Sequence, residues 1–156
     1  WSCGIPVNVW LGTSIENQET ADERIPHLLK CPAALRFLSY EPALGPVDLE
    51  QWIPRAQRDF GHSAIGLAIS WVIAGGESGH GARPANIEWF RSMRDQCKAA
   101  GVAFFMKQLG AAGYKSVKDD GSHPPCRAYD YRDAKGGDPS EWPEDLRVRE
   151  FPAVTR

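Results

Sequence analysis

The sequence has no closely spaced pair of cysteines, and this excludes the usual signature of zinc and iron–sulfur sites. Its four cysteines, Cys3, Cys31, Cys97 and Cys126, lie far apart, and no CxxC motif occurs. Such sites take several ligands from neighbouring positions, so we expect no metal site built from this chain alone. Disulfide frameworks belong to small secreted domains, so we expect reduced thiols.

The sequence also has little excess charge and no long apolar run. The 18 lysines and arginines nearly balance 20 acidic residues, which gives a formal net charge of −2. Charge therefore does not support nucleic acid as a partner. No stretch reaches transmembrane length and no signal peptide is visible, so we expect a cytoplasmic protein without membrane contact. The first residue is Trp1 rather than Met, which indicates a trimmed chain or a fragment.

Four short segments, rich in β-branched and aromatic residues, predict buried strands. They cover residues 7–12, 35–40, 69–75 and 102–107. Their nearly continuous apolar character is typical of strands that are covered on both faces, as in parallel sheets.

Two segments between these strands predict helices. Residues 20–31 begin with a Thr20 cap, and Pro26 within them predicts a kink or two short helices. Residues 86–100 have a good N-cap at their start and a glycine directly after their end. One face of this second helix carries Ile87, Phe90, Met93 and Cys97, which we expect in the core.

The alternation of strands and helices predicts an α/β fold with a parallel sheet. About four βα units fit into residues 1–112. Residues 113–156 are rich in Gly, Pro and Asp, and we expect an extended tail that packs back on the body.

Polar residues follow the end of each predicted strand. They are Ser14, Glu16 and Asn17 after the first; Ser39 and Glu41 after the second; Gly75, Gly76, Glu77 and Ser78 after the third; and Lys107 and Gln108 after the fourth. Parallel strands end at the same edge, so Glu16, Glu41, Glu77 and Lys107 should converge as ligand anchors, acid/base groups or metal ligands. The alternative is that such glutamates cap the next helix or pair with a neighbour.

The glycines of residues 75–79 would let backbone groups approach a ligand closely, or they form a tight turn at the strand end. Arg83 follows this segment, and its guanidinium would clamp an anionic group or pair with a carboxylate.

Residues 8–49, the motif WVIAGGESGHGARP, residues 94–110 and the motif KGGDPSEWPEDLRVREFP together resemble a phage and prophage family, gene product thirty-seven/sixty-eight. Nearly the whole chain takes part in this resemblance. Full-length members of that family are of unknown function and look like radical-SAM proteins. The resemblance implies that a cysteine cluster and half of a barrel precede this segment, which would form a partial, TIM-barrel-like half-barrel.

The resemblance also implies roles for the residues at the strand ends. Catalytic roles fall to Glu41, Glu77 and Lys107, cofactor binding to Gly75, Gly76 and Ser78, and substrate binding to Ser14, Glu16, Asn17, Ser39, Arg83 and Gln108, with no metal ligand. Gly-Gly-Glu looks like the motif that holds the amino group of S-adenosylmethionine, although here it follows a late strand rather than an early one. The chain would then be the substrate-side half of an enzyme that is active only as part of a longer chain. S-Adenosylmethionine and an iron–sulfur cluster would bind elsewhere in the full-length protein.

Two other functions are compatible with the sequence. One is a non-catalytic binding or assembly module of a phage or defence system, which would use the tail residues Lys115, Lys118, Lys135, Arg147 and Arg149. The other is a hydrolase that binds a hard cation through its three strand-end glutamates. In each case a half-barrel leaves two sheet edges open, so we expect pairing with the missing N-terminal half or self-association.

Overall fold

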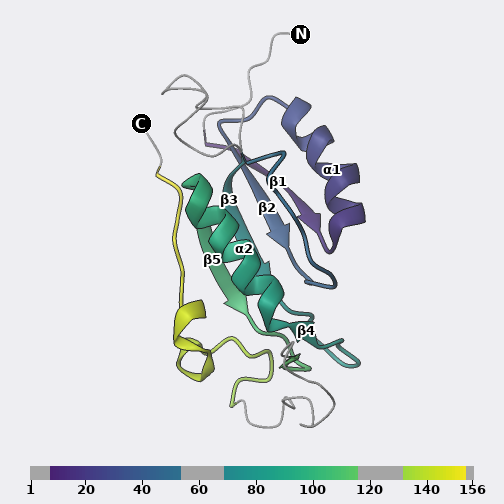
Figure 1. The fold of residues 1–156 in the computed structure, drawn as a ribbon, viewed down its shortest axis with the longest axis vertical. Coiled ribbons are helices and arrows are strands. Elements are labelled where there is room, and N and C mark those ends of the chain that lie inside the picture. Colours follow the sequence, from purple (N-terminus) through teal and green to yellow (C-terminus); the bar gives the residue numbers. More distant parts are fainter. Residues whose placement is uncertain (1–7, 54–68, 116–131, 154–156) are drawn as a thin grey trace.

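The computed structural model describes residues 8–53, 69–115 and 132–153, and its centre is a four-stranded parallel sheet (Figure 1). The strands lie in the order β1-β2-β3-β5 and span β1 (Trp10–Ile15), β2 (Leu35–Tyr40), β3 (Ile69–Gly75) and β5 (Ala103–Gln108). The predicted α/β fold with a parallel sheet is confirmed. The sheet is not closed into a barrel, which agrees with a partial half-barrel.

The remaining elements connect or flank this sheet. They are the helices α1 (Gln18–Lys30) and α2 (Ile87–Ala100), the short strands β4 (Ala85–Asn86) and β6 (Tyr114–Lys115), and the 3₁₀ turns η3 (Pro139–Glu141) and η4 (Glu144–Leu146). Strands β4 and β6 pair with each other in parallel. Within the described ranges, no helix combines the length and the apolar character that crossing a membrane requires.

The helices begin and end where the local chemistry favours it. Asn17 rather than Thr20 caps α1, because the two side chains form a reciprocal capping box at its first turn. The helix continues through Pro26 as one element, and Ile25 and Leu28 are buried on either side of the proline. Of the two predicted alternatives, a kink or two short helices, the second is therefore wrong. The second predicted helix is confirmed with its Asn86 cap and with Gly101 at φ 70°.

Strand β1 lies three residues further along the chain than predicted, whereas the other strands agree to within one residue. The prediction placed Ser14 in the loop because it is polar. In the structure Ser14 pairs in register with Ser39 inside the sheet. A polar side chain is tolerated there because it points away from the helices, to the less covered face.

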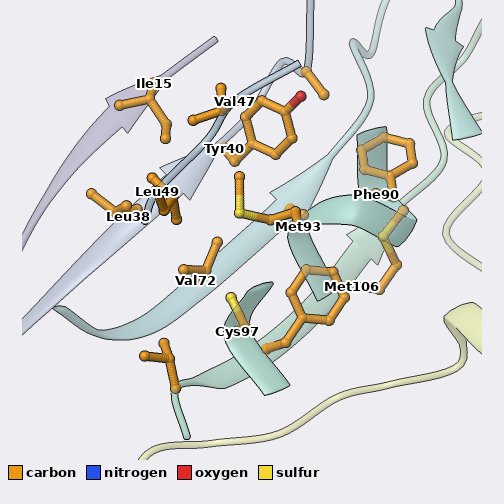
Figure 2. Packing of buried hydrophobic residues seen from close by; sticks show 14 of the residues in the cluster. Ile15, Leu38, Tyr40, Val47, Leu49, Val72, Phe90, Met93, Cys97 and Met106 are labelled. Atoms are coloured by element: carbon orange, nitrogen blue, oxygen red, sulfur yellow. The ribbon is translucent and has the colours of Figure 1, made fainter. Parts of the chain in front are cut away.

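Both helices pack on the same face of the sheet, and the core lies between the helices and the strands. Figure 2 shows the part of this core under α2. Leu38, Tyr40, Val72 and Met106 point from the strands into this core. The predicted stripe of α2 meets them with all four of its members buried. Helices on one face of a parallel sheet are typical of barrels, because each right-handed crossover returns on the same side.

The outer edge of β5 is covered by the end of the tail. Phe105 pairs with Arg149 in an antiparallel bridge, Met106 N donates to Val148 O at 2.8 Å, and Glu150 N donates to Phe104 O at 2.9 Å. The expectation of two open edges is therefore wrong for β5, because the tail supplies the missing partner. The outer edge of β1 has no strand partner in the ranges that the structure describes.

The tail reaches this edge because aromatic and ionic contacts hold it. Trp142 and Leu146 are buried in the core. Asp145 accepts hydrogen bonds from Arg91 at 2.9 Å and from Arg94 at 2.7 Å, so helix α2 fixes the turn before the edge segment.

Candidate functional site

A carboxylate and an ammonium meet at the carboxyl edge of the sheet, although a strand lies between them. Glu41 follows β2, and its Oε2 lies 2.9 Å from Nζ of Lys107 on β5. Gln108 donates from Nε2 to the other oxygen, Oε1, at 3.0 Å. The Glu41 side chain is 17% exposed and that of Lys107 51%, so the carboxylate is held from within while the ammonium reaches solvent.

The contact depends on the two glycines that end β3. A Cβ on Gly75 would lie 3.1 Å from Cδ of Glu41, so the missing side chain makes room for the carboxylate to cross β3. A Cβ on Gly76 would lie 2.1 Å from the carbonyl oxygen of Leu109, so this glycine allows close packing of two backbones. Neighbouring protein atoms therefore leave no room for a side chain at either position.

The other two strand-end glutamates have different partners. Glu77 binds the Nε of Arg83 at 2.8 Å and also accepts from its backbone N–H, so it closes the loop after β3. These hydrogen bonds from Arg83 lower the pKa of Glu77 to about 2. Glu16 pairs with Arg24 of α1 at 3.0 Å. Of the three carboxylates, only Glu41 forms an ion pair with Lys107.

The partners of these three glutamates decide whether the strand ends fit a metal ion or S-adenosylmethionine. Across the described ranges, no three His, Cys, Asp or Glu side chains are grouped so as to hold a metal ion. The Gly-Gly-Glu segment does not fit the amino group of S-adenosylmethionine either. The oxygens of Glu77 are taken by Arg83, and the glycines are filled against Glu41 and Leu109.

Other predicted residues either make structural hydrogen bonds or lie exposed at the surface. Asn17 caps α1, and Ser78 lies exposed in the loop after β3. In the tail, Arg147 donates to the carbonyls of Ser140 and Trp142, and Arg149 to those of Met106, Lys107 and Gly137. These two arginines therefore hold the tail in place.

The sheet face opposite the helices, called the open face below, carries an aromatic cluster. Every second residue of each strand points to it. The ring of Trp71 lies 5.9 Å from those of Trp10, Phe37 and Phe105, and 5.3 Å from that of Phe151. Phe37 also lies over Gly12, where a Cβ would meet its ring at 2.4 Å. The sequence pattern indicated apolar strands but not this cluster, because apolar residues occupied both alternating sets.

Ser14 and Ser39 lie next to this cluster on the open face. The register places them side by side, with Ile73 opposite Ser39 and Phe105 opposite Ile73. The two serines lie one step closer to the carboxyl ends of the strands than Phe37 does. Within the part of the chain that the structure describes, neither serine hydroxyl has a hydrogen-bond partner.

Comparison with known protein families gives a match over most of the chain. Residues 2–136 match the family described as "Protein of unknown function (DUF5131)". Neither the curated proteins nor the solved structures contain a match.

Proposed function

Because the chain belongs to the DUF5131 family of unknown function, we propose a function from its geometry: it forms the substrate-side half of a barrel-like α/β enzyme. The observation that carries the proposal is the Glu41–Lys107 pair, which two strand ends and a glycine bring together above β3. The carboxyl edge of a parallel sheet is where the loops of such folds build their sites.

The pair has the chemistry of an acid/base site. Glu41 accepts a hydrogen bond from the ammonium of Lys107, and Gln108 fixes the orientation of its carboxylate. Lys107 uses one of its three N–H groups on Glu41, which leaves the others for a substrate oxygen. A substrate that binds here would meet a fixed acceptor and a mobile donor side by side.

The resemblance to phage and prophage proteins extends the proposal to radical-SAM chemistry. The iron–sulfur cluster and S-adenosylmethionine would bind to residues outside this chain, since Glu77 and its glycines do not fit the cofactor. The described residues would bind and orient the substrate.

The test uses the complete reading frame that contains this chain, purified without oxygen and reconstituted with iron and sulfide. Reductive cleavage of S-adenosylmethionine is measured with and without a small-molecule extract of the source cells. Glu41→Gln and Lys107→Met should lower the extract-dependent increase by about 10²-fold. Glu23→Gln and Lys98→Met, which alter exposed groups on α1 and α2, are the matched controls and should keep it.

Each outcome of this experiment tests a different part of the proposal. A protein that contains no iron and does not cleave S-adenosylmethionine contradicts the radical-SAM extension. Pair variants that respond to the extract like the controls contradict the site. Pair variants that only lower the melting temperature show a structural cross-link between β2 and β5.

We also propose that the sheet is extended at the outer edge of β1. The sequence of β1, WLGTSI, has no charge or proline, which commonly protect a free edge. The partner would be a second copy of this chain or the N-terminal half that the resemblance implies. Light scattering of this chain alone should show self-association that Thr13→Lys weakens, whereas a monomer at high concentration contradicts pairing with a second copy.

A further inference from the structure

The open face of the sheet is organised in rows that run across the strands toward the Glu41–Lys107 pair. The first row is Gly12, Phe37, Trp71 and Ala103, and the second is Ser14, Ser39, Ile73 and Phe105. The pair forms the third row. Moving along the β1 and β2 side of the face, the side chains therefore change from the ring of Phe37 through the hydroxyls of Ser14 and Ser39 to the charged pair, while Ile73 and Phe105 keep the other half of the second row apolar.

The aromatic cluster around Trp71 offers an apolar contact surface with one well-exposed ring, that of Phe151. Trp71 and its neighbours are half-buried, because their rings pack edge to face. Phe151 lies on this cluster at 35° to Trp71 and is 66% exposed, so one side of its ring is free in the described part of the chain. Rings of this kind stack with nucleobases of any sequence.

The charges on this face nearly compensate each other. Lys107 is neutralised by Glu41. Arg149 lies over the Phe105 ring at 5.4 Å, and three of its hydrogen bonds go to main-chain carbonyls. Among the described residues of this face, a phosphate would find no fork of free guanidinium donors, and Glu41 would repel it. Hydroxyl groups fit better, since Ser14, Ser39 and Lys107 all offer donors.

We propose that the open face binds an uncharged nucleoside, with its base on the Trp71 cluster and its sugar hydroxyls toward Ser39 and the Glu41–Lys107 pair. This inference rests on the proposed function and names the substrate class of the same site. It requires a planar ring and vicinal hydroxyls in one ligand.

The experiment measures binding of adenosine, guanosine, cytidine and uridine, together with their 5′-monophosphates and methyl glucoside, to the same anaerobically purified protein. Equilibrium dialysis gives the affinities, and fluorine NMR of fluorotryptophan-labelled protein locates the contact, with the Trp71 signal assigned through Trp71→Phe. At least one nucleoside should bind and shift the Trp71 signal. Its monophosphate should bind no more tightly.

Substitutions test the position of the sugar. Ser39→Ala and Lys107→Met should each weaken nucleoside binding about tenfold, because each removes one hydrogen bond. Thr13→Val is the matched control, since this hydroxyl lies on β1 but points to the helix side, and it should leave binding unchanged.

The inference is overturned if no nucleoside binds, if methyl glucoside binds alone, or if the monophosphates bind much more tightly than the nucleosides. It is also overturned if Thr13→Val weakens binding as much as Ser39→Ala. A retained response to the cell extract, lost in Glu41→Gln, would in those cases leave the proposed function standing with another substrate class.

Discussion

The Cδ of Glu41 lies 3.1 Å from the position that a Cβ atom on Gly75 would occupy. A glycine on β3 thus determines whether a carboxylate from β2 can reach an ammonium on β5. Gly75→Ala should push Glu41 away from Gln108 and destabilise the protein by about 1–3 kcal/mol, since the neighbours are closely packed. Urea denaturation measures this loss.

A double-mutant cycle separates this contact from a general effect of the glycine. Glu41→Ala makes room for the new methyl group, so the Glu41→Ala/Gly75→Ala protein should lose less stability than the sum of the single changes. Full additivity would mean that the two residues do not compete for the same space.

The Glu77–Arg83 contact predicts an unusual titration. Hydrogen bonds from Arg83 lower the pKa of Glu77 from 4.5 to about 2. Because the folded pKa is the lower one, the contact stabilises the folded state above pH 4.5, and this contribution is lost as the pH falls toward 2. Carbon NMR of the carboxyl group should show the low midpoint in the native protein. In Arg83→Gln the midpoint should move back toward 4.5, and equal midpoints would contradict the assignment.

The edge segment of the tail should loosen when its ionic anchor is removed. Asp145→Asn weakens the bonds to Arg91 and Arg94, at a cost of about 0.5–1 kcal/mol because the site is partly exposed. Hydrogen exchange of the Met106 amide, which donates to Val148 O, should accelerate. Asp95→Asn removes only the Arg94 contact and is the matched control. If Met106 is equally protected in both variants, Asp145 does not anchor the edge.

The two described cysteines should differ in reactivity. Burial raises the pKa of the Cys97 thiol to about 12, whereas Cys31 is exposed. Since only the thiolate reacts, iodoacetamide should modify Cys31 about 10³-fold faster at neutral pH. Peptide mapping after brief labelling measures the ratio. Unfolded protein should label equally at both sites, and a native ratio near one would contradict the burial of Cys97.

Sequence patterns that extend over only a few residues predicted most of the helices and strands correctly. Asn86, Gly101 and the stripe from Ile87 to Cys97 depend on local chemistry, and α2 follows them. The predicted end of β1 came too early because Ser14 is polar, and an apolar run does not show which face of a strand will be less covered. Only the packing of the helices on one side decides that face.

The strand-end residues show the same limit. Their position at the carboxyl edge follows from the alternation of strands and helices, which the sequence contains. The sequence does not show which of these residues contact one another, because all three glutamates closely follow a strand. In the structure each has a different partner: Glu41 pairs with Lys107, Glu77 with Arg83, and Glu16 with Arg24. Partners depend on strand order and on the space above Gly75.

The sequence by itself determined an α/β chain with parallel strands and polar residues at one edge, because capping, periodicity and turn residues act over a few positions. The tertiary structure alone decided that Glu41 crosses β3 to Lys107, that the tail covers the edge of β5, and that aromatic rings gather around Trp71. These contacts join residues far apart in the chain, and their geometry exists only when the whole sheet is assembled.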